Sequence, residues 1–276
     1  MPSPKDLIFD LKRRRVRRPA DAGVPVSEPV PVLEPEFEPE PELDEEPEPA
    51  LPLAERLNMP QVLALGMLNR AQEALVIGAG PWAVREWAEA LTARTRGVTV
   101  VDADKKLLAQ ARSFCKSAIA AQYDRPDWTS KLGGLRFDVV LVGEALSHLP
   151  DPVGFLRQVR EILTPDGVVV AIVPNVAHGE KRLELLTGEF PRDFEPVPTC
   201  HHYTRTRVRE LFAFSGYGIT EIQEFEKPLF DDHSELVPEL FPAPLLRAIA
   251  LDEDLATSHF VVKAAPSTPE ALLRGL

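Results

Sequence analysis

The chain has 276 residues, of which 44% are hydrophobic, and a formal net charge of -12 at pH 7. This length allows one or two domains with a full core. The folded part is not strongly basic, so we do not expect nucleic acid as a partner. Two cysteines are too few for a disulfide framework, and no run approaches the roughly 20 apolar residues of a membrane span. With no signal-like start, we expect a cytoplasmic location and no transmembrane segment.

The first 52 residues have a composition that predicts no packed core. Residues 1–20 carry seven Lys or Arg against two Asp, whereas residues 21–50 carry eleven Asp or Glu and no basic residue. The Pro/Glu-rich tract cannot bury enough apolar area to offset its ordering entropy. We expect a short basic segment at 1–20, a disordered arm at 21–52, a folded domain at 53–265 and a loose tail at 266–276. The arm is a candidate tether for a partner protein, although a solvated chain start is the simpler interpretation.

Helix-like and strand-like segments alternate after residue 53. An amphipathic period predicts helices, and short apolar runs predict buried strands. This rhythm predicts a doubly wound α/β sheet. We expect one or two helices within 53–70, broken at Pro60, and further helices at 82–95, 105–116, 151–163 and 204–215. We expect strands at 74–77, 98–102, 117–121, 137–142, 167–173, 217–225 and 258–264. Between these, 174–202 is expected to be irregular and 228–254 to be a Pro-rich helical excursion.

The first strand runs into Gly78-Ala79-Gly80, and a helical pattern begins directly afterwards. This pattern indicates a turn without side chains and a helix N-terminus aimed at a ligand. The second strand ends at Asp102, about 20 residues further on, the usual distance for a carboxylate that holds ribose hydroxyls. The sequence therefore predicts a cofactor that contains a nucleoside. Residues 78–83 also fit a dinucleotide fingerprint, so a nicotinamide-dependent oxidoreductase is an alternative, but it leaves 204–215 and the last two strands unexplained.

Four segments, in this order and spacing, resemble the class I S-adenosylmethionine-dependent methyltransferases. They are 76–80 with Asp102, 137–152, 163–167 and 173–179. The resemblance implies a seven-stranded Rossmann-like sheet and S-adenosylmethionine as the cofactor. The most similar subgroup accompanies glycosyltransferases of surface polysaccharides, which implies a sugar, a glycan or another small molecule with a hydroxyl group as the acceptor.

The resemblance also implies roles for individual residues. The turn Gly78-Ala79-Gly80 would let the backbone approach the methionine part of the cofactor, and Asp102 would bind the ribose. Glu144 would lie near the sulfonium. Gln122 is nearest in register to the residue that reads the adenine edge, with Asp124 and Asp127 as alternatives.

A hydroxyl acceptor needs a proton acceptor with a pKa near neutrality, and histidine is the natural candidate. We predict that His178 or His201 is this general base. His148 also follows a strand end but is more simply structural, and His202 adjoins His201. No spacing of Cys, His and Asp resembles a zinc site, so we expect no metal.

Three departures from the family pattern support a second interpretation. Val76 stands where the family usually has an acidic residue, and Trp82 replaces the third glycine of the loop. The Asp that usually reads the adenine edge after the third strand has no clean match. The alternative is a methyltransferase-like fold that has lost cofactor binding and acts as a protein-binding or scaffolding module.

Overall fold

The computed structural model describes residues 53–68, 71, 73–78, 84–188, 199–230 and 236–268. These residues belong to one unit, Pro49–Leu276. The basic segment predicted at 1–20, the arm predicted at 21–52 and the tail beyond residue 268 lie outside the described residues.

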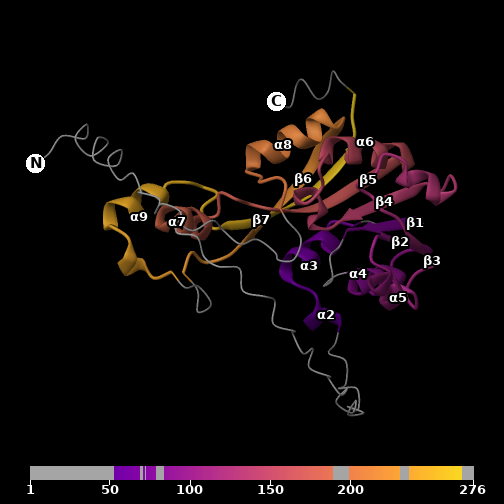
Figure 1. Ribbon diagram of the computed structural model, residues 1–276, viewed down its shortest axis with the longest axis horizontal. Helices are drawn as coiled ribbons and strands as arrows, with labels where there is room; N and C mark the ends of the chain where they lie inside the picture. Colours follow the sequence, from indigo (N-terminus) through magenta and orange to yellow (C-terminus); the bar gives the residue numbers. More distant parts are fainter. Residues whose placement is uncertain are drawn as a thin grey trace, which may run out of the picture. The chain divides into compact units, whose positions relative to one another are not determined.

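The strands are β1 Glu73–Ile77, β2 Gly97–Asp102, β3 Ser117–Ala120, β4 Phe137–Val142, β5 Leu163–Pro174, β6 Tyr217–Glu226 and β7 Thr257–Pro266. They form one seven-stranded sheet in the order β3-β2-β1-β4-β5-β7-β6 (Figure 1). Neighbours from β3 to β5 pair in parallel, and β7 runs antiparallel to both β5 and β6. The predicted doubly wound, Rossmann-like methyltransferase sheet is confirmed.

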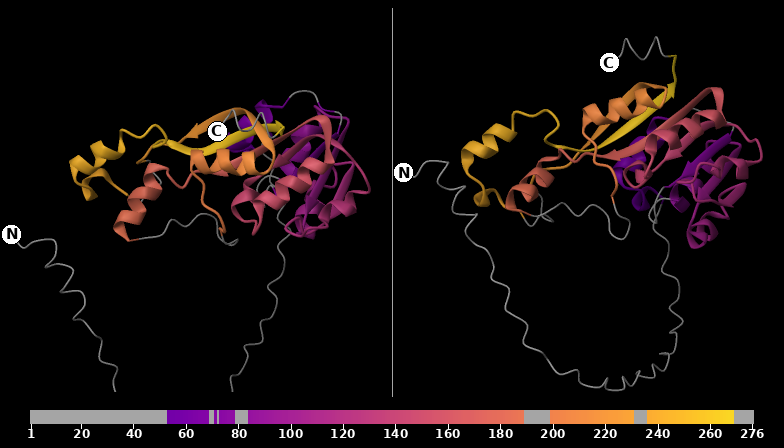
Figure 2. Two further views of the ribbon diagram at one scale, coloured as in Figure 1. Left: turned by 90° about the horizontal axis from the view of Figure 1, so that it is seen from above. Right: turned by 45° about the horizontal axis from the view of Figure 1, so that its top comes forward.

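The helices of the described chain are α2 Leu53–Arg56, α3 Met59–Gly66, α4 Val84–Thr92, α5 Lys105–Ala111, α6 Pro152–Ile162, α7 Gly179–Thr187, α8 Arg205–Phe214 and α9 Ala243–Ile249. Short 3-10 turns are η1 Trp128–Leu132, η2 Glu144–Ser147 and η3 Pro238–Leu240. The helices α3, α4 and α5 cover one face of the sheet, and α6 and α8 cover the other (Figure 2). Both faces of the central strands are therefore removed from water.

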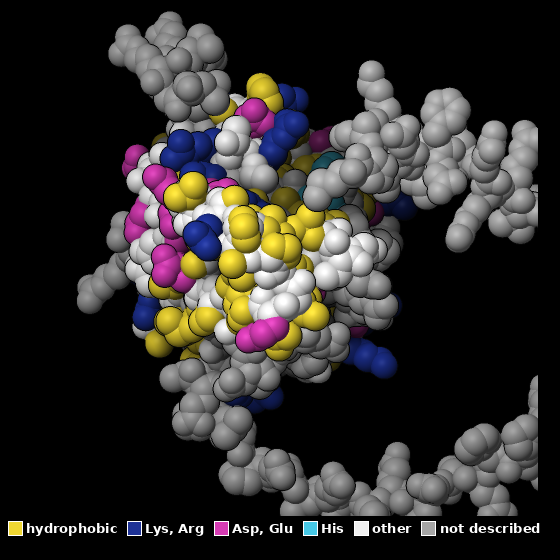
Figure 3. All heavy atoms as spheres, turned by 90° about the vertical axis from the view of Figure 1, so that its left-hand side faces the viewer, with side chains coloured by type: hydrophobic (Ala, Val, Ile, Leu, Met, Phe, Trp, Pro, Cys, Tyr) yellow, Lys and Arg dark blue, Asp and Glu magenta, His cyan; other side chains and the backbone are white. Residues whose placement is uncertain are grey.

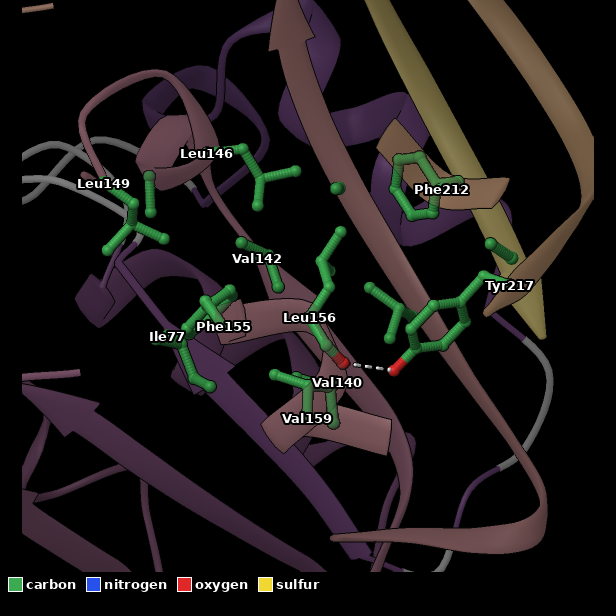
Figure 4. Close-up of a cluster of buried hydrophobic side chains, with 14 of the residues drawn as sticks. Ile77, Val140, Val142, Leu146, Leu149, Phe155, Leu156, Val159, Phe212 and Tyr217 are labelled. Atoms are coloured by element: carbon green, nitrogen blue, oxygen red, sulfur yellow. Dashed lines mark hydrogen bonds between the residues drawn. The ribbon is translucent and has the colours of Figure 1, made fainter. Parts of the chain in front are cut away.

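The core is split into two clusters because alternate residues of each strand point to opposite faces. In β1, Leu75 and Ile77 belong to the cluster under α6 and α8, whereas Val76 belongs to the cluster under α3 and α4. On the α6 side, the Tyr217 hydroxyl donates a hydrogen bond to the buried Leu156 carbonyl at 3.0 Å (Figure 4). Strands with apolar residues on both faces, such as β1, are typical of parallel sheets that are covered by helices on both sides.

Local capping fixes where several helices begin. Asp151 accepts a hydrogen bond from the Gly154 N–H at 2.8 Å, and Pro152 occupies the first turn of α6, as predicted. Two helices, α2 and α3, occupy the region 53–70, but the break between them falls at Leu57 and Asn58 and not, as predicted, at Pro60. Asn58 forms a capping box with Gln61, and Pro60 lies inside the first turn of α3. A missing N–H is tolerated there because the first N–H groups of a helix have no intrahelical partner.

The prediction that 174–202 is irregular is wrong for α7. This helix has no apolar stripe that the sequence could reveal, since only Gly179 and Leu183 are buried in it. The predicted helical excursion at 228–254 contains η3 and α9, and α9 buries no side chain. Figure 3 shows the face at this end, where hydrophobic side chains gather. The large exposed hydrophobic residues on or near α7 and α9 are Leu185, Leu186, Val237, Leu240 and Leu251.

No helix in the part of the chain that the structure describes combines the length and apolar character needed to cross a membrane.

Candidate functional site

The candidate site lies at the carboxyl edge of the sheet, where β1 has β2 on one side and β4 on the other. The chain order of the strands reverses at this point, and open α/β sheets bind ligands in the crevice formed there. Gly78 directly follows β1 and has a φ of 55°, and a Cβ added to it would lie 2.5 Å from the Ala145 Cβ. Only glycine fits this bend. The predicted cofactor residues Ala79 and Gly80 lie outside the described residues, as does Trp82.

Asp102 is the last residue of β2 and is 6% exposed. Its Oδ1 accepts a hydrogen bond from the Asp104 N–H at 2.8 Å, which fixes the carboxylate orientation. Burial raises the pKa of the Asp102 carboxyl, and the hydrogen bond from the Asp104 backbone opposes this shift. A hydrogen bond from a hydroxyl group to a partly desolvated carboxylate is stronger than the same hydrogen bond in water.

Gln122 is exposed just after β3, where it lines a hollow of about 280 Å³. Ala103, which follows Asp102, lines the same hollow. Trp128 is 1% exposed and contributes a hydrophobic wall. The other residues that line this hollow are Ala120, Ala121, Arg125, Asp127 and Lys131.

Glu144 begins η2, directly after β4. Its Oε1 lies 3.8 Å from Nε2 of His259, and His259 Nδ1 lies 2.8 Å from the Ser258 Oγ. His259 is paired with Pro174 in the sheet, because β7 runs antiparallel and therefore starts at the edge where β5 ends. Sequence reasoning missed His259. The available signal was a histidine at the beginning of the final strand, but its relevance depends on that strand being antiparallel.

His178 is held inside the structure at the N-cap position of α7 and is 2% exposed. Its Nε2–H donates to the Lys227 carbonyl at 3.2 Å. Burial lowers the pKa of His178, although the hydrogen bond to Lys227 opposes this shift. The imidazole is therefore neutral at pH 7, and Nδ1 is the nitrogen that remains to accept a proton.

His148, His201 and His202 gather around a cavity of only about 10 Å³. This is about the space of one water molecule. The His201 Nε2–H donates to the Pro150 carbonyl at 3.3 Å, and the imidazole lies 6.2 Å from the Tyr203 ring. The other residues that line this cavity are Ser147, Pro174, Val176, Thr199 and Tyr203.

The structure thus places Gly78, Asp102, Gln122 and Glu144 at or just beyond the carboxyl ends of four neighbouring strands. Among the residues described, no group of three or more His, Cys, Asp or Glu is arranged to hold a metal ion.

These features coincide with a family match. A family described as "Methyltransferase domain" matches residues 64–222, which include β1 through most of β6. The chain belongs to this methyltransferase family. No curated protein matches the chain.

Solved methyltransferases share the fold. An O-methyltransferase from a trans-AT PKS multienzyme of Brevibacillus brevis, in complex with S-adenosyl-L-homocysteine, is 13% identical with a TM-score of 0.53, over 78% of this chain and 75% of that one. The CcbJ methyltransferase of Streptomyces caelestis is 17% identical with a TM-score of 0.50, over 79% and 97%. A methyltransferase from a complex with an activator protein of Haloferax volcanii is 15% identical with a TM-score of 0.50, over 75% and 88%.

Proposed function

We propose that this chain transfers a methyl group from S-adenosylmethionine to a hydroxyl group of a sugar or another small molecule. The observation that carries the proposal is the pairing of a buried Asp102 carboxylate with the side-chain-free bend at Gly78, at the reversal point of the sheet. A buried carboxylate that accepts hydrogen bonds, next to a glycine bend at a strand end, suits the ribose of a nucleoside. Membership of the methyltransferase family selects the methyl donor over a dinucleotide.

The residues present fit this cofactor. Asp102 would accept hydrogen bonds from the ribose hydroxyls, and Gln122 would contact the adenine in the hollow beside it. The turn Gly78-Ala79-Gly80 would bring backbone N–H groups to the methionine part. Glu144 would place its negative charge close to the sulfonium. When bound, S-adenosylmethionine supplies an already activated methyl group, so the protein mainly has to align the two reactants.

A hydroxyl acceptor must lose a proton to one of this chain's bases. His178 and His201 remain our proposed general bases, because each commits its Nε2–H to a carbonyl and keeps Nδ1 as an acceptor. The structure adds His259, whose imidazolium form would be stabilised by Glu144. Geometry relative to the acceptor decides between them.

A partner protein, bound through the N-terminal arm, is also proposed. The support is the arm's charge pattern, and one structural neighbour is a methyltransferase in complex with an activator protein.

Calorimetric titration of the full chain with S-adenosylmethionine, S-adenosylhomocysteine and NAD tests the function. We expect saturable binding of the first two and none of NAD. Binding of NAD alone would support an oxidoreductase. No binding of any of the three would contradict the proposal and favour a protein-binding module that has lost the cofactor.

A further inference from the structure

The three tyrosines of the chain differ in how their hydroxyl groups are satisfied. Tyr203 donates a hydrogen bond to the Leu146 carbonyl at 3.1 Å, and Tyr217 donates one to the Leu156 carbonyl at 3.0 Å. The hydroxyl of Tyr123 has no hydrogen-bond partner among the described residues, and its partly buried side chain packs against the core. A phenol hydroxyl that no protein group engages, at the border of the core, can donate to and accept from a ligand.

Tyr123 follows β3 directly after Gln122, and its side chain reaches across the edge of the sheet to β1. A Cβ added to Gly78 would lie 3.0 Å from the Tyr123 Oη and 3.1 Å from its Cζ. Burial raises the pKa of Tyr123, and the nearby negative charge of Asp102 raises it further. The phenol is therefore protonated at neutral pH and able to donate.

The Tyr123 ring is fixed by packing. It meets the Phe155 ring edge-on with the centroids 6.1 Å apart, and Phe155 stacks on Trp128 at 5.9 Å. Trp128 is also a wall of the hollow beside Gln122. The position of the hydroxyl is thus set by the hydrophobic core before any ligand arrives, which lowers the entropy lost on binding.

We propose that the Tyr123 hydroxyl is a further cofactor-binding group, which donates a hydrogen bond to the ribose that Asp102 also holds. A ribose hydroxyl both donates and accepts. The carboxylate of Asp102 can only accept, and the phenol beside it supplies the donor that a diol needs. This inference rests on the proposed function, since it names one more contact to the same nucleoside.

The experiment compares Tyr123→Phe with Tyr217→Phe, which makes the same chemical change at a hydroxyl paired with a core carbonyl. Binding of S-adenosylhomocysteine is measured by calorimetry, and unfolding is measured by thermal denaturation without ligand. We expect Tyr123→Phe to weaken binding about 3- to 10-fold, as for one neutral hydrogen bond, and to leave the Tm at or above that of the wild type. Tyr217→Phe should lower the Tm and leave binding unchanged.

The 2′-deoxy and 3′-deoxy forms of S-adenosylhomocysteine locate the contact. For one of them, the affinities of the wild type and Tyr123→Phe should become equal, because the partner hydroxyl is missing. Equal binding of S-adenosylhomocysteine by the wild type and Tyr123→Phe would overturn the inference while leaving the proposed function intact. So would a fall in Tm as large as that of Tyr217→Phe. If neither the wild type nor any variant binds the ligand, the proposed function itself is wrong, and the Tyr123 contact falls with it.

Discussion

The carboxylate of Glu144 and the imidazole of His259 face each other across the carboxyl edge of the sheet, with Oε1 and Nε2 3.8 Å apart. Glu144 follows a parallel strand, whereas His259 lies near the start of the antiparallel strand β7. Their side chains are 24% and 16% exposed, so the pair is sheltered and still open to a ligand. The Glu144 carboxylate would stabilise a protonated His259, and a cationic ligand would compete with His259 for this carboxylate.

Replacing Glu144 by Gln should therefore discriminate between the charged and the neutral cofactor. We expect affinity for S-adenosylmethionine, which carries a sulfonium, to fall about 3- to 10-fold, as for one partly exposed charge pair. Affinity for S-adenosylhomocysteine, which carries none, should change less than about 2-fold. Calorimetric titration of both ligands measures the ratio. Equal losses for the two ligands would show that Glu144 does not lie near the sulfonium.

Replacing Gly78 by Ala should destabilise the fold more than the same change at Gly133. The two glycines have φ values of 55° and 61°, but a Cβ meets Ala145 at 2.5 Å in the first case and nothing within 4 Å in the second. Backbone strain should lower the free energy of unfolding by about 1–2 kcal/mol at Gly133. The added steric contact should bring the loss at Gly78 to about 2–4 kcal/mol. Urea unfolding measures both, and equal losses would exclude crowding at Gly78.

The lowered pKa of His178 predicts a loss of stability on acidification. In the unfolded chain, His178 takes up a proton near pH 6.5, whereas in the folded chain the buried imidazole stays neutral at this pH. The free energy of unfolding therefore falls as the pH drops through this value. The contribution approaches about 1.4 kcal/mol per pH unit below pH 6.5. Urea unfolding at pH 7.5, 6.5 and 5.5 should show a smaller decline for His178→Asn than for the wild type. Parallel curves for the two proteins would mean that His178 is protonated in the folded state.

The start of β7 should depend on Arg205, the first residue of α8. Its guanidinium binds Asp254 with two nitrogens, pairs with Glu224 at 2.7 Å and lies 5.1 Å from the centre of the Phe260 ring. Lysine keeps the charge but cannot reproduce the planar fork. We expect Arg205→Lys to lower the free energy of unfolding by about 1 kcal/mol, and Arg207→Lys, at an exposed pair, to change it little. Similar effects of the two substitutions would argue against an anchoring role.

Features set by neighbouring residues were predictable from the sequence. The strand 137–142 is apolar throughout and is found with the same bounds as β4, and the start of α6 follows from Asp151 and Pro152 alone. The carboxyl-edge positions of Gly78, Asp102 and Glu144 follow from their places at the ends of such strands.

Features set by distant residues were not. The approach of His259 to Glu144 requires the last strand to enter the sheet in reverse, after a long excursion that has few buried side chains. The orientation of the Tyr123 ring depends on packing against Phe155. The helix α7 is held by Leu183, its one buried residue apart from the glycine, and by contacts with residues distant in the sequence. No local pattern encodes these relations.

The central claim is that Asp102 holds the ribose of a bound nucleoside, and the most direct test is the affinity of Asp102→Asn for S-adenosylhomocysteine. The amide keeps an oxygen for the Asp104 N–H and removes a charge whose burial is unfavourable, so the fold should be as stable as the wild type. We predict that the dissociation constant of Asp102→Asn is about 10- to 100-fold larger than that of the wild type, which corresponds to the loss of a charged hydrogen bond. The control variant Asp104→Asn, at the exposed N-cap of α5, should bind with wild-type affinity. Wild-type affinity in Asp102→Asn, or no binding by the wild type at millimolar ligand, would contradict the account.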